Sequence, residues 1–261
     1  MTVSFGMLLD TAHKLANAAG KVTLRHFCTN SAADHKGGAL FDPVTAADRE
    51  AETAMRAILA REWPGHGIAG EEFGSTGEDA DYVWTLDPID GTRAYILGLP
   101  VWGTLIGLQH QGKPLLGIMD QPFTGERFWS DERAAWHRGP KGLTQCKTRA
   151  CSDISQAMLG ATTPDMFEGE DEVRFNRLAK AVRMRRFGGD CYFYCMLALG
   201  YIDIVAEAKL KPFDIVPLIP IVEKAGGTVT RWDSGGAPAR GRYIACGDPA
   251  ILNPALSILT A

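Results

Sequence analysis

The first part of the chain passes from a helical to a strand-like spacing of apolar residues. Apolar side chains recur at steps of three and four from Leu8 to Val22, which predicts an amphipathic helix that continues to about Phe27. A second helical pattern opens near Thr45 and ends at Pro64, where the chain can no longer continue a helix. An antiparallel meander behind these helices is then predicted from β-rich runs at 82–86, 101–109, 115–120, 126–130 and 134–138.

Helical and strand patterns alternate after Gly139, which indicates an α/β arrangement. We therefore expect an α+β half at 1–139 and an α/β half at 140–261, which meet near residues 139–150. The second half contains predicted elements at 173–183, 184–187, 191–199, 202–207, 214–224, 228–232 and 243–246.

The composition is that of an ordinary folded protein. Of the 261 residues, 46% are hydrophobic and 22% are charged, with a net charge of −4. Nothing supplies the basic surface that nucleic acid or an anionic membrane requires, so neither partner is expected. The six cysteines form no C-x-x-C pair, which argues against zinc. Asp10 and Lys14 interrupt the first apolar run, so it does not resemble a signal peptide, and a cytoplasmic location is predicted.

Candidate chemistry is concentrated in an acidic segment at residues 62–92, which contains no lysine or arginine. Within it, Glu71-Glu72 and Asp87-Pro88-Ile89-Asp90-Gly91-Thr92 each follow an apolar or β-rich run, and a helix is predicted to start near Thr92. Carboxylates at strand ends suit a hard divalent cation, and a helix start offers N–H groups to an anion. The spacing is compatible with a magnesium and phosphate site, but acidic capping and turn residues explain it as well.

Four motifs occur in the order in which one known family carries them. They are Asp42-Pro43-Val44-Thr45-Ala46-Ala47-Asp48, Glu71-Glu72, the segment from Asp87 to Thr92, and Asp214 ahead of Gly226-Gly227. In these motifs the chain resembles the inositol monophosphatase family of magnesium-dependent, lithium-sensitive phosphatases. The resemblance implies a layered αβαβα sandwich, a homodimer, and a small-molecule phosphate monoester as the substrate.

The resemblance also assigns metal ligands by position. It implies that Glu71, Asp87 and the backbone carbonyl of Ile89 bind one Mg²⁺. A second Mg²⁺ is then bound by Asp87, Asp90 and Asp214, and Glu71 shares a weaker third ion. Two or three Mg²⁺ per site would polarise the phosphate and activate the attacking water.

Further roles follow from the same resemblance. Asp48 and Thr92 are expected to orient the attacking water, with Glu71 among the catalytic residues. The amides of Gly91 and Thr92 are expected to bind the phosphate. Glu72 is expected to point away from Glu71 if the pair lies on a strand.

The chain departs from the family pattern around Asp214. Phe213 stands where many members carry tryptophan, and Pro217 replaces part of an alanine-rich turn. Pro217 is tolerable in the first turn of a helix that begins at Asp214, whereas Pro220 predicts a kink in it. The carboxylate itself is retained.

The second half points to the substrate. Residues 185–192 and 207–214 resemble the histidinol-phosphatase branch of the family more than the inositol branch. L-Histidinol phosphate carries an ammonium group and an imidazole, so Asp190 and Glu207 are expected to bind it by charge pairing. Two other interpretations stay open: Asp190 could cap the helix ahead of Cys191, and Glu207 could bind sugar hydroxyls.

The sequence therefore predicts a Mg²⁺-dependent phosphomonoesterase that hydrolyses L-histidinol phosphate in histidine biosynthesis. An alternative within the family is a broad inositol, sugar or nucleotide monophosphatase. An alternative of another class is a non-catalytic scaffold, against which the complete ligand set argues.

Overall fold

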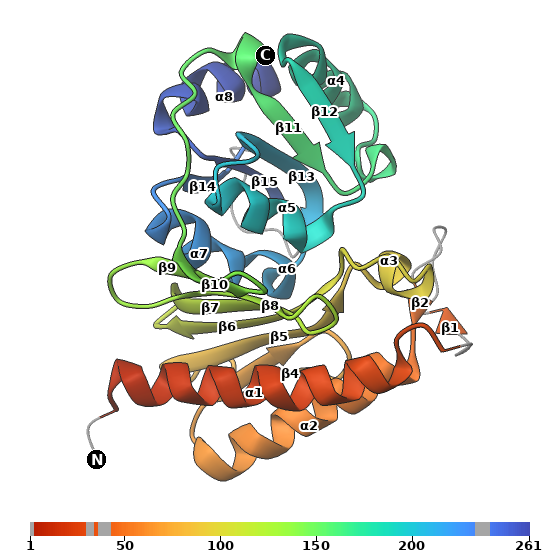
Figure 1. Cartoon of the computed structure of the whole chain (residues 1–261), viewed down its shortest axis with the longest axis vertical. Coiled ribbons are helices and arrows are strands. Elements are labelled where there is room, and N and C mark those ends of the chain that lie inside the picture. Colours follow the sequence, from red (N-terminus) through yellow and green to blue (C-terminus); the bar gives the residue numbers. More distant parts are fainter. Residues whose placement is uncertain (1–2, 30–33, 36–42, 233–240) are drawn as a thin grey trace.

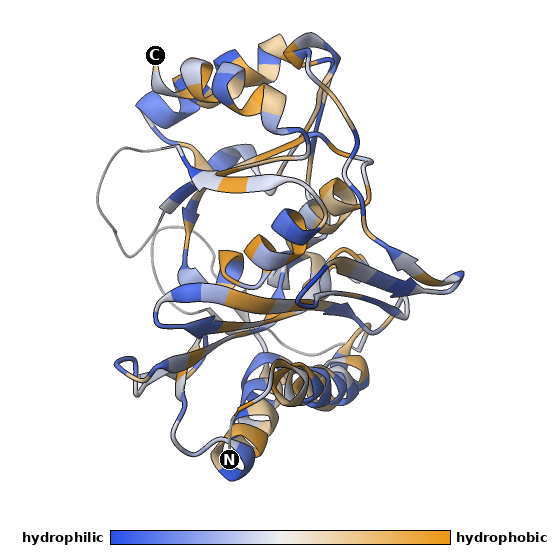
Figure 2. Cartoon of the chain, turned by 90° about the vertical axis from the view of Figure 1, so that its left-hand side faces the viewer, coloured by the Kyte–Doolittle hydropathy of each residue, from blue (hydrophilic) through white to orange (hydrophobic). Residues whose placement is uncertain are grey.

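The computed structural model of the protein describes residues 3–29, 34–35, 43–232 and 241–261. Helices and sheets alternate in five layers (Figure 1). Helices α1 and α2 lie on the outer face of an eight-stranded sheet, and Figure 2 shows them beneath it. Three further helices separate this sheet from a five-stranded one, and α4 and α8 cover the far side. The expected αβαβα sandwich is confirmed. Asp42, from the first sequence motif, lies outside the described residues.

The two outer helices begin where the sequence places N-capping side chains. The Oγ atom of Ser4 accepts a hydrogen bond from the Met7 N–H at 3.3 Å ahead of α1 (Phe5–His26). Ahead of α2 (Ala46–Glu62), the Asp48 carboxylate accepts the Thr45 N–H at 2.8 Å in a capping box. The apolar faces of both helices pack on the sheet, where Trp84 is fully buried. These contacts bury the stripe that the helical spacing predicts.

The eight-stranded sheet extends beyond the predicted meander at both edges. β5 to β9 are antiparallel neighbours, as expected, and β10 adds an unpredicted antiparallel strand at one edge. At the other edge β3 pairs in parallel with β5, and β4 lies outermost. These two unpredicted strands carry few β-branched or aromatic side chains, so their pattern is weak. The last strand of this sheet ends at Gln145, beyond residue 139 but within residues 139–150, where the two halves are predicted to meet. Strand order is β10-β9-β8-β7-β6-β5-β3-β4, with bounds β3 (Gly67–Gly70), β4 (Gly74–Thr76), β5 (Tyr82–Asp90), β6 (Gly103–His110), β7 (Lys113–Gln121), β8 (Glu126–Ser130), β9 (Ala135–Gly139) and β10 (Gly142–Gln145).

The five-stranded sheet mixes parallel and antiparallel pairs in the order β12-β11-β13-β15-β14. The strands β12 to β15 lie where the sequence predicts them, within a few residues, whereas β11 and α8 were not predicted. The bounds are β11 (Met158–Ala161), β12 (Met184–Phe187), β13 (Ile204–Leu210), β14 (Thr228–Arg231), β15 (Gly241–Cys246), α4 (Glu170–Ala181) and α8 (Leu252–Thr260). The smaller elements are β1 (Asp34–His35), β2 (Pro43–Val44), α3 (Thr92–Ile96) and the 3₁₀ turns η1 (Ile154–Gln156), η2 (Pro164–Met166) and η3 (Pro249–Ile251).

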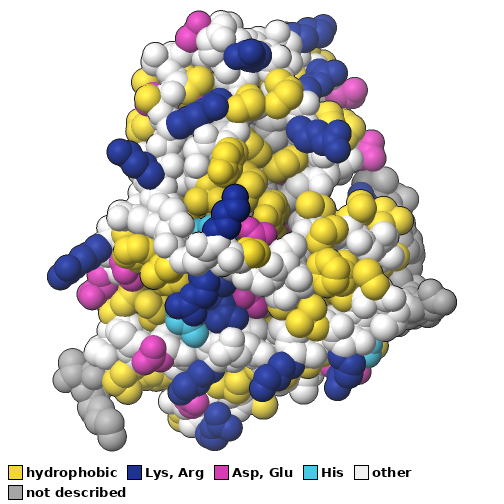
Figure 3. Space-filling view, viewed as in Figure 1, with side chains coloured by type: hydrophobic (Ala, Val, Ile, Leu, Met, Phe, Trp, Pro, Cys, Tyr) yellow, Lys and Arg dark blue, Asp and Glu magenta, His cyan; other side chains and the backbone are white. Residues whose placement is uncertain are grey.

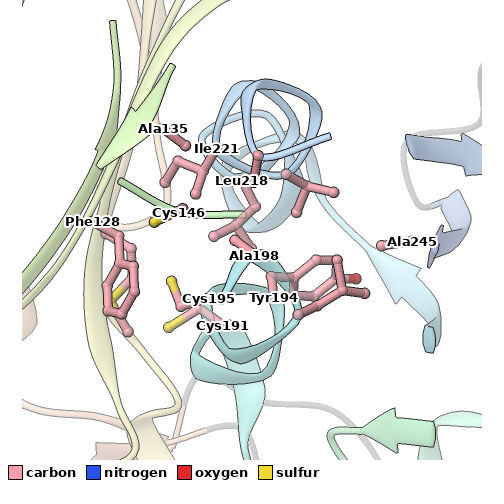
Figure 4. Packing of buried hydrophobic residues seen from close by; sticks show 14 of the residues in the cluster. Phe128, Ala135, Cys146, Cys191, Tyr194, Cys195, Ala198, Leu218, Ile221 and Ala245 are labelled. Atoms are coloured by element: carbon pink, nitrogen blue, oxygen red, sulfur yellow. The ribbon is translucent and has the colours of Figure 1, made fainter. Parts of the chain in front are cut away.

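The middle layer joins the two halves through one shared core. It consists of α5 (Asp190–Ala198), α6 (Pro212–Ile215) and α7 (Leu218–Lys224). Phe128 of the first sheet, Tyr194 of α5, Leu218 of α7 and Ala245 of the second sheet belong to the same buried cluster (Figure 4). Because apolar contacts cross both interfaces of this layer, each half buries its inner face only when the other is present.

The predicted helix from Asp214 to Lys224 is two helices. α6 ends at Ile215 and α7 begins at Leu218, while Val216 and Pro217 between them keep helical dihedral angles. Pro220 falls in the first turn of α7, where its missing N–H removes no intrahelical hydrogen bond. The predicted kink at Pro220 is therefore wrong, and the interruption lies at Pro217.

The junction between α6 and α7 is in close contact with the first sheet. A Cβ atom added to Gly117 of β7 would lie 1.7 Å from the carbonyl oxygen of Pro217, which no rotamer change can relieve. We expect Gly117→Ala to lower the free energy of unfolding by about 3 kcal/mol, because backbone must move in a packed interior. Urea unfolding checks this. In the control Gly6→Ala, on α1 with open space at its Cβ, the stability should be unchanged or slightly higher; equal effects of the two variants would contradict the contact.

Candidate active site

A cavity of about 190 Å³ opens where the end of β5, the start of α5 and α6 meet. It brings together residues that lie far apart in the sequence and come from both halves of the chain. Asp48 is not part of this lining among the described residues, and its predicted role stays a prediction. The predicted site residues in the lining are Glu71, Asp87, Ile89, Asp90, Gly91, Thr92, Asp190, Glu207 and Asp214.

A β-bulge explains why Asp87 and Asp90 face the same cavity. Residues three apart on a regular strand point to opposite faces of the sheet. In β5, however, Asp87 pairs with Leu105 and Asp90 with Gly103, so one extra residue is inserted on the β5 side. Pro88, which cannot donate a ladder hydrogen bond, lies in this bulge. The extra residue reverses the alternation and brings both carboxylates to one side.

Glu71 reaches the same cavity from the neighbouring strand. It follows β3 directly, and its N–H donates to the Leu86 carbonyl at 3.0 Å, one position before Asp87. Glu71 and Glu72 thus lie in a turn and not within a strand. The N–H of Glu72 donates to a carboxylate oxygen of the buried Glu52 at 2.7 Å. Parallel pairing of β3 with β5 therefore places Glu71 beside the carboxylates of β5.

Asp214 completes a group of three aspartates. One carboxylate oxygen from each of Asp87, Asp90 and Asp214 can be chosen so that all three lie within 4.8 Å of one another. Asp214 is held by the Lys211 N–H, which donates to its Oδ2 atom at 2.7 Å. The N–H of Cys191 donates to Asp90 Oδ2, also at 2.7 Å. Backbone donors thus orient the carboxylates without neutralising them.

The clustered carboxylates resist ionisation. Burial, followed by the charges of Glu71 and Asp90, raises the pKa of Asp87 well above its usual range. Burial and the charge of Asp190 do the same to the pKa of Asp90. Burial also raises the pKa of Asp214 to about 7, although the Lys211 N–H lowers it. This accumulation of buried negative charge is unfavourable on its own and favours a bound cation.

Thr92 and Gly91 form the wall beside Ile89. The Thr92 hydroxyl donates to the Ile89 carbonyl at 3.0 Å. Gly91 has φ 82° and lies so close to Asp190 that an added Cβ would be 3.2 Å from its Oδ2 atom. Both features favour glycine at this position. Asp48 is buried in α2, where its Oδ2 atom also accepts the Thr45 hydroxyl at 2.6 Å.

Asp190 lies at the opposite wall, and the interpretation that it caps α5 is wrong. Gly189 is the N-cap residue, and Asp190 is the first residue of the helix. Its φ of 42° is in the left-handed region, which aspartate tolerates better than most residues. Burial and the charge of Glu207 raise the pKa of Asp190 to about 7. The side chain is available to the cavity because it does not cap the helix.

Glu207 lies next to a second bulge, in β13. Its pairing with Tyr243, followed by that of Leu210 with Gly241, inserts an extra residue in β13. Glu207 Oε1 accepts the Thr162 N–H at 2.8 Å, and Oε2 accepts the Tyr194 hydroxyl at 3.0 Å. Thr162 and Tyr194 also line the cavity, and both were missed by the sequence analysis. Only their tertiary position, at the end of β11 and inside α5, reveals them.

The donor set fits magnesium. Carboxylate and carbonyl oxygens line the acidic side of the cavity, and hard divalent cations prefer such oxygen ligands. A divalent cation would also offset the mutual repulsion of Asp87, Asp90 and Asp214, whose oxygens are already within reach of one another. The binding of two or three ions per site stays a prediction.

Comparison with known proteins agrees with this architecture. The chain is 44% identical over 220 residues to the bifunctional phosphatase IMPL2 of Arabidopsis thaliana, covering 84% of this chain but only 62% of that protein. It is 34% identical over 246 residues to the histidinol-phosphatase of Streptomyces coelicolor, covering 91% of each. The structure of an inositol monophosphatase from Zymomonas mobilis matches with a TM-score of 0.87 and 39% identity over the whole of both chains.

A match over nearly the whole chain, and not the site alone, shows the family. The sequence model of the "Inositol monophosphatase family" matches residues 7–258, which include both sheets and every residue of the cavity. Members of this family are metal-dependent phosphatases. The chain belongs to the inositol monophosphatase family.

Proposed function

We propose that the protein is a Mg²⁺-dependent phosphatase that hydrolyses L-histidinol phosphate to L-histidinol and phosphate. The observation that carries this proposal is the position of Asp190 and Glu207, two carboxylates beyond the metal-binding group that line the same cavity. They match the positive charge of the substrate alcohol. The similarity to relatives named histidinol-phosphatase supports the same substrate.

In this proposal the acidic wall holds the metal. Glu71, Asp87, Asp90, Asp214 and the Ile89 carbonyl would be the ligands. Bound Mg²⁺ supplies positive charge that stabilises the phosphoryl oxygens and makes water more acidic. The protein contributes oriented ligands, because the bulge in β5 and the backbone donors to Asp90 and Asp214 fix their carboxylates before any ion binds.

The wall formed by Gly91 and Thr92 would orient the remaining reactants. The two N–H groups would bind phosphate oxygens, and the Thr92 hydroxyl would orient the attacking water. Asp48 would assist in orienting the water, held in place by its hydrogen bonds to Thr45. Since α3 spans only five residues, local N–H groups matter more here than the helix dipole.

Inositol phosphate hydrolysis is the second candidate. It is favoured by the 39% identity to the inositol monophosphatase from Zymomonas mobilis, which covers both chains completely. Glu207 is compatible with either substrate, because a carboxylate accepts hydrogen bonds from hydroxyl groups and from ammonium groups alike. Asp190 discriminates between the two candidates, since a cationic alcohol gains from a second charge and a neutral one does not.

A phosphate-release assay with L-histidinol phosphate and inositol 1-phosphate tests the proposal. We expect kcat/KM to be at least about tenfold higher for L-histidinol phosphate, the preference that one charge pair supplies. Asp190→Asn should reduce this preference, because it removes the charge and keeps the shape. Asp165→Asn, an exposed carboxylate near the cavity residue Met166, should leave it unchanged. Faster turnover of inositol phosphate would contradict the proposed substrate.

The expected homodimer stays a proposal as well. The exposed apolar side chains of α3 and the following loop offer a surface for it: Leu97 is 73% exposed, Leu99 50% and Ile96 39%. Figure 3 shows hydrophobic side chains gathered over this part of the molecule. Apolar patches of this kind often mark protein interfaces. Within the described residues, no helix has the length and apolar character needed to span a membrane.

A further inference from the structure

A cluster of three polar side chains lies outside the active site, between the first sheet and α5. The Tyr192 hydroxyl donates to Glu126 Oε2 at 2.6 Å, and His137 Nε2 lies 3.1 Å from Glu126 Oε1. The side chains of Glu126 and His137 are only 15% and 16% exposed. Burial, with the neighbouring Glu126 carboxylate, raises the pKa of the Tyr192 hydroxyl, which therefore stays a donor. Partial burial strengthens such a charge-assisted hydrogen bond.

The helix that carries Tyr192 also carries the active-site residue Asp190. α5 is nine residues long and begins at Asp190. Its first turn contacts the first sheet through two hydrogen bonds. The Cys191 N–H donates to Asp90 at the end of β5, and the Tyr192 hydroxyl donates to Glu126 at the start of β8. Together these fix the first turn of α5 relative to the sheet that supplies the candidate metal ligands.

The two hydrogen bonds differ in one respect. Asp90 is a candidate metal ligand, so the bond from Cys191 ends on a carboxylate that also has to serve the metal. Glu126 does not line the active-site cavity among the described residues. Its interaction with Tyr192 is thus independent of the metal and holds α5 from a separate point of the sheet.

Asp190 lies close to Gly91, and its backbone conformation is unusual for a residue with a side chain. An added Cβ at Gly91 would lie 3.3 Å from Asp190 Cβ and 3.2 Å from its Oδ2 atom. The left-handed φ of Asp190 must also be maintained by the surrounding structure. A small rotation of the first turn of α5 would move this carboxylate relative to Gly91, and with it the separation between the phosphate-binding wall and the proposed ammonium-binding group.

We propose that Tyr192 and Glu126 are positioning residues that set substrate preference through Asp190. This inference rests on the proposed function and extends it beyond the cavity. The hydrogen bond between them holds the first turn of α5 so that Asp190 lies at a fixed distance from the phosphate site. A cationic alcohol depends on that distance, whereas an alcohol without charge does not.

Tyr192→Phe tests the proposal, since it removes the hydroxyl and keeps the ring. We expect kcat/KM for L-histidinol phosphate to fall about tenfold, mainly through KM, because a small misplacement of a binding group is costly. For glycerol 2-phosphate, whose alcohol is neutral, the change should be less than about twofold. The Mg²⁺ concentration for half-maximal activity should not change. Glu126→Gln, which keeps an acceptor for the hydroxyl, should retain most of the preference.

A double-mutant cycle shows whether Tyr192 acts through Asp190. Adding Tyr192→Phe to Asp190→Asn should cause no further loss of preference. The control is Tyr201→Phe. Tyr201 is exposed and lines, together with Glu126 and Tyr192, a second cavity outside the active site, and its substitution should have no effect. Equal losses for both substrates, or additive effects in the cycle, would overturn the positioning role. A wild-type enzyme without preference for L-histidinol phosphate contradicts the proposed function, whereas a preference that survives Tyr192→Phe contradicts only this inference.

Discussion

Asp90→Asn is expected to lower kcat/KM by at least about 10³-fold while the protein stays folded. Asp90 is one of three aspartates whose oxygens lie within 4.8 Å of one another, and a neutral amide is a much weaker ligand for Mg²⁺. Asparagine can still accept the Cys191 N–H through its carbonyl oxygen. Because burial raises the pKa of Asp90 well above its usual range, removing the charge should also raise the melting temperature of the metal-free protein. Steady-state kinetics and thermal unfolding measure the two effects.

Asp120→Asn gives the opposite pattern and serves as the control. Asp120 is buried in β7, where its Oδ1 atom accepts a hydrogen bond from Arg127 Nε at 2.6 Å, outside the active-site cavity. Burial raises the pKa of Asp120, but Arg127 lowers it through a hydrogen bond and its charge. The substitution leaves this partly buried arginine without its partner charge, and we expect that loss to outweigh the relief of burial, so stability should fall. Activity at a temperature where the variant is folded should be retained. Unchanged turnover in Asp90→Asn, or equal losses in both variants, would contradict the assigned site.

The acidic residues of the site drew attention because their chemistry is visible locally, but their assignment as metal ligands came from the resemblance to the family. Glu71, Asp87 and Asp90 lie in a segment with no lysine or arginine, and such a concentration of carboxylates is compatible with a cation site. Their convergence could not be derived from the same pattern. A regular strand separates Asp87 from Asp90 onto two faces, and the bulge at Pro88 that reunites them depends on the pairing with β6.

Long-range pairing also explains what the sequence analysis missed. β3 is a short, glycine-containing strand that is fixed by parallel pairing with β5, so its own residues carry little signal. Thr162 and Tyr194 enter the cavity because β11 ends there and α5 begins there, and neither lies in a motif. The interruption at Pro217 follows from the close approach of Gly117, which is a contact between segments about 100 residues apart in the chain. Local patterns thus indicate the elements, while their exact junctions depend on tertiary contacts.

Removing the metal should make stability strongly dependent on pH. Burial raises the pKa of Asp214 from 3.8 to about 7 in the metal-free protein. A carboxyl group with a raised pKa binds more protons in the folded state, so the free energy of unfolding falls as pH rises above 4 and levels off above 7. The full shift corresponds to about 4 kcal/mol, of which about 3 kcal/mol is lost between pH 5 and pH 8. Mg²⁺ should reverse this loss, since it binds the ionised carboxylates of the folded state.

Comparison with Asp214→Asn isolates this contribution. Histidines with lowered pKa values, such as His13 at about 4, change stability in the opposite direction as pH rises, but they contribute equally to both proteins. In EDTA, urea unfolding at pH 5 and pH 8 should show the wild type losing about 3 kcal/mol relative to the variant. Adding Mg²⁺ at pH 8 should stabilise the wild type far more than the variant, because the variant lacks one ligand. The prediction is contradicted if the stability of the metal-free wild type changes from pH 5 to pH 8 in the same way as that of the variant. In that case the protein itself stabilises the ionised carboxylates, and the cluster does not require a cation.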